Sequence, residues 1–207
     1  MNDDITTEPF LVGEEEFGCW MVAEPFPTRD LNILLEDLHV AFGSGFVWTL
    51  KQITSHGEFK PIPGETDIFS VGGDTCEDYD NLLNAARKAV EHGYRVFILP
   101  NPKGIRTADF IFERKGVYKL FDLKTISGRN SIDNRFEDSK GQTNRVLLNI
   151  STDYDPVSLA RSVKKYFERN SEALEVLIFK RGKCLSVIRE DTESKYYFKQ
   201  FIPKYIK

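Results

Sequence analysis

The stretch Thr107–Thr125, "TADFIFERKGVYKLFDLKT", decides the fold. Two apolar runs flank Lys115 and Gly116, and a two-residue loop that contains glycine between such runs is a typical β-hairpin signal. With this turn, Phe110 lies opposite Phe121, on the apolar face of both strands. The sequence therefore predicts two antiparallel strands with a fixed register.

The other face of the hairpin carries charge. Side chains on a strand alternate between its two faces, so Asp122 and Lys124 share one face. The same register places Asp109 opposite Asp122, with Lys124 diagonal to both. Like charges directly opposite each other destabilise a sheet, so these carboxylates require a positive group between them. A divalent cation is one answer, and Lys124 alone is the other.

The metal interpretation has a defined chemistry. Asp109 and Asp122 would hold Mg²⁺ or Mn²⁺ through oxygen ligands and leave positions for water and a phosphate oxygen. The ion lowers the pKa of bound water and offsets charge that develops on the phosphate, while Lys124 assists. The plain alternative is an Asp–Lys ion pair on a half-solvated strand, which is common. The matching position of Asp109 favours Asp109, Asp122 and Lys124 as candidate catalytic residues.

Composition limits the class of protein. The chain has 207 residues, 41% of them hydrophobic and 13% aromatic, which suits a globular core. No apolar run approaches the roughly 18 residues that span a bilayer. The first residues, "MNDDITTEPF", are acidic and lack the features of a signal peptide. We therefore expect a cytoplasmic protein, or one delivered into a target cell, with no membrane partner. Cys19, Cys76 and Cys184 are too scattered for a disulfide frame or a zinc site and are expected to be buried thiols.

Charge is divided unevenly along the chain. Residues 1–100 carry 18 acidic and 6 basic side chains, whereas residues 101–207 carry 14 acidic and 22 basic ones. Such a split indicates a part that binds a polyanion and an acidic part that covers it or binds something else. The alternative is that both parts are simply solvated. We predict an acidic α+β N-terminal appendage over residues 1–75 and an α/β domain over residues 76–207.

Periodicity and turn signals predict the order of elements. In the second part this order is a helix, three strands, a helix, a strand, a helix and two strands, which indicates an α/β fold with a mixed central sheet flanked by helices. Asp155 and Pro156 are typical of a helix start. The expected segments are a helix ending before Gly93, strand 94–100, the hairpin, helix 130–142, strand 144–151, the helix from Asp155 and a second hairpin, 173–190, turning at Arg181–Lys183. In the first part we expect strand 17–26, helix 28–42, strand 45–53 and a turn-rich loop over 61–75.

The charged face of the hairpin resembles a known signature. Asp109 followed by Asp122-Leu123-Lys124 resembles the PD-(D/E)XK nuclease motif, with Ala108 where the proline often stands. The order of elements over residues 77–188 resembles the C-terminal nuclease domains of contact-dependent growth-inhibition toxins, several of which are tRNases. The resemblance implies a restriction-endonuclease-like core and metal-dependent hydrolysis of phosphodiester bonds in RNA or DNA. It also implies nucleic acid and a cognate immunity protein as partners.

The resemblance extends to a ligand on the first core helix. Such nucleases commonly place a glutamate there, pointing at the metal. The matching face of this chain offers Glu77, Asp80, Asn81 and Asn84. We expect Asp80 and Asn84 to join Asp109 and Asp122 as metal ligands. An asparagine in this position would weaken metal binding or mark a degenerate site.

Polar and basic residues follow Lys124 and lead into a helix N-terminus, which is a ready site for phosphate. Each of them alone is better explained as a capping or surface residue. As a cluster they indicate a binding site for a nucleic-acid backbone. The candidate substrate-binding residues are Thr125, Ser131, Asn134, Arg135, Gln142 and Arg145.

Two other functions are compatible with these residues. A metal-independent, barnase-like toxin RNase could use Lys124, Thr125, Ser131 and Arg135 for acid–base and phosphate chemistry. A non-catalytic nucleic-acid or protein binding module, such as a mobile-element accessory, would keep the fold without turnover. RNA and DNA are not distinguished, because these side chains contact the backbone and not base edges. The oligomeric state is also open.

Overall fold

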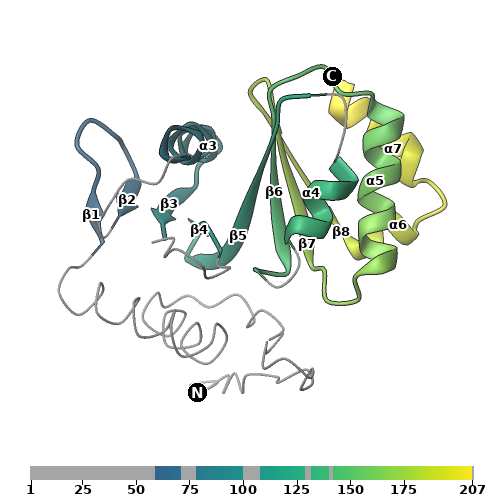
Figure 1. Ribbon diagram of the computed structural model, residues 1–207, viewed down its shortest axis with the longest axis horizontal. Helices are drawn as coiled ribbons and strands as arrows, with labels where there is room; N and C mark the ends of the chain where they lie inside the picture. Colours follow the sequence, from purple (N-terminus) through teal and green to yellow (C-terminus); the bar gives the residue numbers. More distant parts are fainter. Residues whose placement is uncertain (1–58, 71–77, 100–107, 129–131, 140–141, 207) are drawn as a thin grey trace.

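The computed structural model describes residues 59–70, 78–99, 108–128, 132–139 and 142–206 (Figure 1). The elements predicted over residues 17–53 lie outside this part of the chain. An eight-stranded sheet with the strand order β1 to β8 runs through the described residues. Its strands are β1 Lys60–Pro61, β2 Ile68–Ser70, β3 Arg95–Ile98, β4 Phe110–Arg114, β5 Val117–Ile126, β6 Arg145–Ile150, β7 Glu175–Lys180 and β8 Lys183–Ile188.

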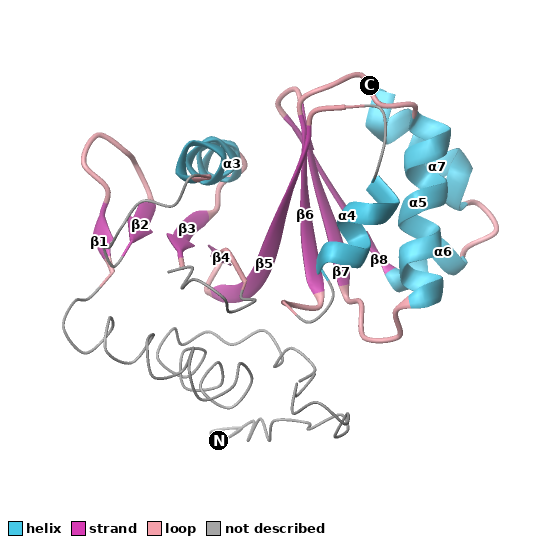
Figure 2. Ribbon diagram, viewed as in Figure 1, coloured by secondary structure: helices cyan, strands magenta, loops and turns pink. Residues whose placement is uncertain are grey.

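The sheet is mixed. Strands β2 and β3, β5 and β6, and β6 and β7 pair in parallel, and the other neighbours are antiparallel. Helix α3 lies on one side of the sheet, and the other helices lie on the opposite side (Figure 2). The helices are α3 Tyr79–Glu91, α4 Ile132–Ser139, α5 Pro156–Arg169, α6 Arg189–Glu193 and α7 Tyr197–Ile206. The predicted α/β class and the order from α3 to β8 are confirmed, and α6 and α7 follow as elements that were not predicted.

Both predicted hairpins have the turn chemistry that their sequences indicate. Lys115 and Gly116 have φ angles of 55° and 77°, and Arg181 and Gly182 have 47° and 76°. Two successive positive φ angles match the right-handed twist of the flanking strands, and glycine takes the second position without steric cost. In the second hairpin, Lys183 already belongs to β8, so the turn is one residue shorter than predicted.

Helix α5 begins as its sequence predicts. The Asp155 carboxylate accepts a hydrogen bond from the Ser158 backbone N–H at 2.7 Å, and Pro156 occupies the first helical position. This cap satisfies one of the backbone donors that a helix leaves unpaired at its start. The loop from β6 into α5 is thereby held in a defined conformation.

The turn-rich loop predicted over residues 61–75 is wrong for part of its length. It contains β2, and β1 ends within it. Ile68 is fully buried and pairs in parallel with Val96, and Ile62 donates a backbone hydrogen bond to the Ile68 carbonyl at 2.9 Å. Three residues between turn formers give little periodicity, so this strand is formed by its neighbour β3 and not by local preference. The sheet therefore begins before residue 76.

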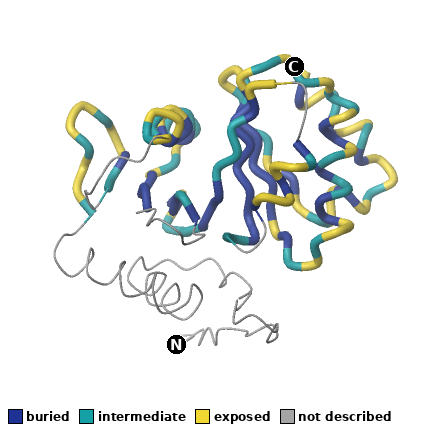
Figure 3. The backbone as a smooth tube through the Cα atoms, viewed as in Figure 1, coloured by how far each residue is buried: buried dark blue, intermediate teal, exposed yellow. Residues whose placement is uncertain are grey.

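The sheet separates two main clusters of buried side chains. In Figure 3 the central strands are coloured as buried. On one face, α3 packs against aromatic and aliphatic side chains that include Phe110, Phe112 and Phe121. On the other face, α4, α5 and α7 pack against Ile126 and alternate residues of β6. A smaller cluster is formed by Phe97, Leu99, Ala108, Ile111 and Leu120. The charged face of β5 therefore lies on the side of α4 and α5.

Candidate active site

Asp122 is a buried carboxylate in the middle of β5, with 1% of its surface exposed. Two residues on, the Lys124 ammonium donates a hydrogen bond to Asp122 Oδ1 at 3.1 Å and lies 2.9 Å from Oδ2. Strand alternation brings the two side chains to one face, as predicted. The Oδ2 atom of Asp122 is buried and accepts no hydrogen bond of good geometry. Such an atom is costly to bury and is open to a further positive partner.

Asp109 lies beside Asp122 because of the strand register. β4 and β5 pair Phe110 with Phe121, so Asp109 and Asp122 are the next residues outward. The Asp109 backbone N–H donates to the Phe121 carbonyl at 3.0 Å, and its carboxylate Oδ2 accepts from the Leu123 backbone N–H at 2.6 Å. The Asp109 side chain is thereby fixed at the end of the ladder, facing β5.

The two carboxyl groups act on each other. The pKa of Asp122 is raised well above its ordinary value, first by burial and then by the charge of Asp109, against the opposing effect of Lys124. The pKa of Asp109 is also raised, chiefly by burial, and is opposed by the Leu123 N–H and by Lys124. Two close carboxylates in a poorly solvated position favour either a shared proton or a cation.

A third carboxylate, at the start of α3, influences Asp109 through its charge. Asp78 is the residue before the helix, and its charge raises the pKa of Asp109. The Asn81 amide donates to Asp78 Oδ1 at 3.3 Å, which steadies the Asp78 side chain. Sequence reasoning considered the neighbouring Glu77, which lies outside the described residues, and did not consider Asp78. The signal was present in the spacing of Asp78 and Asn81, which places both on one side of the first helical turn.

The two predicted helix ligands lie elsewhere on α3. Asp80 is exposed, and its charge acts on Arg87, on the side of the helix that pairs with Glu65. Asn84 accepts a hydrogen bond from the Asn149 amide at 3.3 Å. Asn149 lies two residues beyond Leu147 on β6 and therefore shares its sheet face, which α3 covers. Asp122 faces the opposite side of the sheet. The structure does not bring Asp80 or Asn84 to the Asp109–Asp122 pair.

The predicted substrate-binding residues are spread over three places. Ser131 lies outside the described residues. Thr125 follows Lys124 on β5 and faces the α3 side, where its Oγ1 is buried without a hydrogen-bond partner. Asn134 and Arg135 are on the exposed side of α4, which packs on β5 and α5. The Gln142 amide donates to the Asp138 carbonyl at 2.9 Å.

Arg145 is part of a buried ion cluster and not of the Asp122 face. Its Nε lies 3.4 Å from Glu175 Oε2, and burial lowers its pKa to about 10. The same oxygen receives the Lys119 ammonium at 2.7 Å, and Ser186 donates to Glu175 Oε1 at 2.7 Å. Lys119, Arg145 and Glu175 share the sheet face covered by α3. The geometry gives Arg145 a structural partner on the opposite side of the sheet from Asp122.

The acidic pair fits a hard divalent cation. Among the described residues, no three or more histidine, cysteine, aspartate or glutamate side chains gather into a metal cluster. Mg²⁺ and Mn²⁺ nevertheless bind through one or two carboxylates together with waters and substrate phosphates. Asp122 Oδ2, which accepts no hydrogen bond of good geometry, and the adjacent Asp109 carboxylate supply the oxygen ligands that such an ion prefers.

Comparison with known proteins supports one family over part of the chain. Residues 106–184 match the family model of the contact-dependent growth inhibition CdiA C-terminal domain. This segment includes Asp109, Asp122 and Lys124. The predicted resemblance to these domains is therefore confirmed over residues 106–184, whereas the PD-(D/E)XK type stays a prediction.

Comparisons were also made with solved structures and with curated proteins. A solved complex titled "CdiA-CT/CdiI toxin and immunity complex from Burkholderia pseudomallei" is similar at 18% identity and a TM-score of 0.40, over 64% of this chain and 96% of that one. No curated protein matches the chain. Among the described helices, none has the length and apolar character needed to cross a membrane.

Proposed function

We propose that this chain is a toxin domain of the CdiA C-terminal type that hydrolyses phosphodiester bonds in RNA or DNA with the help of Mg²⁺ or Mn²⁺. The observation that carries the proposal is the buried Asp122 beside the half-buried Asp109, with Lys124 Nζ 2.9 Å from Asp122 Oδ2. The match of residues 106–184 to the CdiA C-terminal domain supports delivery into a target cell and a cognate immunity protein as partner.

The two aspartates are proposed to bind the cation. Asp109 and Asp122 would hold the cation, and the charge of Asp78 at the start of α3 acts on Asp109. When bound, the ion supplies a Lewis acid for a phosphoryl oxygen and makes an attacking water more acidic. The Leu123 N–H fixes Asp109 at 2.6 Å, so the acceptor geometry is present before substrate arrives.

Lys124 would contact the phosphate. An ammonium has three N–H donors, and the bond to Asp122 Oδ1 at 3.1 Å leaves capacity for a phosphate oxygen. Its positive charge would offset the negative charge that grows on the phosphate as the bond to the leaving oxygen breaks. Asp122 keeps Lys124 in place, so loss of either side chain should impair the reaction.

The test is a cleavage assay on total tRNA and plasmid DNA with Mg²⁺, with Mn²⁺ and with EDTA. Asp122→Asn and Lys124→Gln preserve side-chain size, and Glu190→Gln removes an exposed carboxylate as control. We expect EDTA to abolish cleavage and both site variants to lose about a hundredfold or more. Cleavage that Asp122→Asn leaves unchanged would refute the proposed site.

One observation favours a second candidate, a metal-independent RNase. The raised pKa values of Asp109 and Asp122 mean that a shared proton could replace the cation between them. A protonated carboxyl beside Lys124 could then act as a general acid toward the leaving oxygen. RNA cleavage that survives EDTA, with DNA left intact, would favour this candidate.

A further inference from the structure

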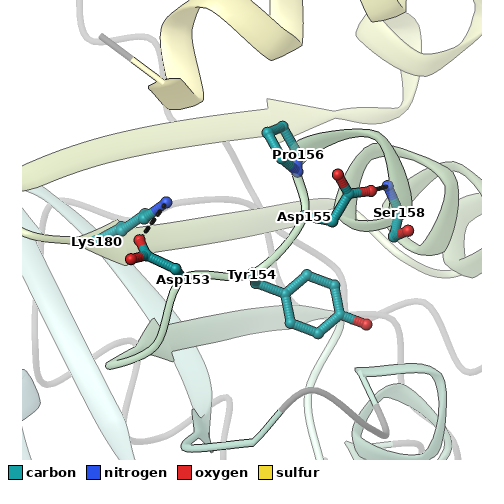
Figure 4. A pocket seen from close by; sticks show the side chains of 6 residues that line it. All are labelled: Asp153, Tyr154, Asp155, Pro156, Ser158 and Lys180. Carbon is teal, nitrogen blue, oxygen red and sulfur yellow. Dashed lines mark hydrogen bonds and ion pairs between the residues drawn. The ribbon is translucent and has the colours of Figure 1, made fainter.

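A pocket that the proposed reaction does not use opens where β6 and β7 end, beside the first turn of α5 (Figure 4). Its volume of about 470 Å³ lies within the range of small-ligand sites. Polar side chains lie at two flanks of the pocket, and the rings of Tyr154 and Pro156 also border it. The lining residues are Asp153, Tyr154, Asp155, Pro156, Ser158 and Lys180.

The pocket lies at the same end of the sheet as Lys124. The Ser151 backbone N–H and its Oγ both donate to the carbonyl of Ile126, the last residue of β5, at 3.0 Å. Ile126 is two residues beyond Lys124, or about 7 Å along the strand. Tyr154 packs against the core on the α5 side, which is the side that Asp122 and Lys124 face. A strand bound at Lys124 would therefore reach the pocket with an adjacent nucleotide.

The charges in the pocket and directly beside it balance. Asp153 pairs with Arg181 Nη2 at 2.7 Å and lies 3.8 Å from Lys180 Nζ. Asp155 adds a second carboxylate on the opposite flank (Figure 4). Arg181 does not line the pocket but offsets Asp153 from beside it, so the two carboxylates and the two cations together carry no net charge that would repel a polyanionic strand. They do leave carboxylate oxygens that accept hydrogen bonds from a ligand.

Two flat rings border the pocket. In Figure 4 the Pro156 ring lies between the Lys180–Asp153 pair and Asp155, and the Tyr154 ring lies below Asp155 in this view. Tyr154 is half-buried, so its ring is held by the core and still borders the pocket. Aromatic side chains stack on any nucleobase because every base has a π-face.

We propose that this pocket receives one unpaired nucleobase next to the scissile phosphate and favours bases that carry an exocyclic amine. Carboxylate oxygens accept hydrogen bonds from the amine of cytosine, whereas uracil turns a carbonyl oxygen toward them. This inference rests on the proposed function, because nucleic acid is its ligand. It adds a base preference to a site that otherwise contacts the backbone.

The test measures binding of fluorescent oligocytidine and oligouridine, as RNA and as DNA, by anisotropy in EDTA. An Asp122→Asn background prevents turnover under either mechanism. The double variant Asp153→Asn/Asp155→Asn removes both charges, and asparagine preserves the α5 cap. Tyr154→Ala removes the stacking surface. Glu190→Gln and Tyr196→Ala are exposed controls of the same chemistry.

We expect cytosine to be preferred about tenfold and the double variant to abolish that preference. Tyr154→Ala should weaken binding of both oligonucleotides about five- to tenfold and leave their ratio unchanged. Equal affinity for the two oligonucleotides, no binding of either, or a preference that the double variant retains would overturn the inference. Cleavage with no base preference would leave the proposed function standing, whereas base preference without cleavage would keep the pocket and remove the proposed function.

Discussion

The Asp109 carboxylate accepts a hydrogen bond from the Leu123 backbone N–H at 2.6 Å. This contact makes an acidic side chain part of the β4–β5 pairing and fixes it beside Asp122. The bond satisfies a backbone donor at the point where the ladder ends, so Asp109 has a structural role as well as the proposed chemical one.

These two roles of Asp109 are separable by substitution. Asp109→Asn keeps an acceptor for Leu123, whereas Asp109→Ala leaves that N–H without its partner. We expect the alanine variant to lose about 1–3 kcal/mol of unfolding free energy in EDTA and the asparagine variant to stay near the wild type. Both should lose cleavage. Urea denaturation and the cleavage assay check this, and equal stability of the two variants would show that the bond to Leu123 contributes nothing.

Glu175 is the centre of the buried ion cluster with Lys119 and Arg145. Removing one partner of such a cluster leaves the others buried without compensation, so Glu175→Ala should cost about 3–5 kcal/mol of unfolding free energy. Glu175→Gln keeps oxygen and volume and should cost less. Glu190→Gln, as an exposed control, should stay within about 0.5 kcal/mol. Urea denaturation measures these losses. An unfolding free energy of Glu175→Ala equal to that of Glu190→Gln would contradict this account of the cluster.

Tyr166 should make stability depend on alkaline pH. Burial raises its pKa to about 12 from an ordinary value of 10. A raised folded-state pKa contributes stability that is complete below pH 10 and is lost as pH rises toward 12, because the unfolded chain ionises first. Relative to Tyr166→Phe, the wild type should lose about 1 kcal/mol between pH 9 and pH 11. The measurement is the unfolding free energy of both proteins from urea denaturation at each pH. If the two pH profiles run parallel, Tyr166 ionises as readily in the folded state as in the unfolded chain, which would contradict the prediction.

The cap of α5 gives a smaller, local effect. Asp155→Ala removes the acceptor for the Ser158 N–H and should cost about 1 kcal/mol, whereas Asp155→Asn should cost little. Thermal unfolding followed by circular dichroism compares the two. An equal loss in the two variants would mean that the negative charge, which both remove, and not the cap, stabilises this helix start.

Sequence reasoning reached the fold where local signals were strong. The hairpin at Lys115–Gly116, its register and the start of α5 at Pro156 each follow from turn or capping chemistry, and the structure has them. β2 was missed because only three residues form it and its parallel partner, β3, is distant in the sequence. The final helix was missed although its apolar residues recur at helical spacing, with Tyr197, Phe201 and Tyr205 buried.

Of the candidate site, sequence analysis predicted correctly only the residues that belong to one hairpin. Asp109, Asp122 and Lys124 are adjacent through strand pairing, which the turn fixes. Residues on other elements are brought in by packing, and the sequence did not show which of them act on the pair. The charge of Asp78 raises the pKa of Asp109, whereas the charge of Asp80 acts on Arg87. Arg145 was assigned to substrate by its charge, but strand alternation turns it to the opposite sheet face, where Glu175 binds it.

The most direct test of the account is calorimetric titration of Mn²⁺ into the wild type, Asp122→Asn and Glu190→Gln. If Asp109 and Asp122 hold a cation, the wild type and Glu190→Gln bind one ion with the same affinity and Asp122→Asn binds it at least tenfold more weakly. Equal binding by all three proteins, or RNA cleavage by a wild type that binds no Mn²⁺, would contradict the metal site and leave the carboxyl pair with a shared proton.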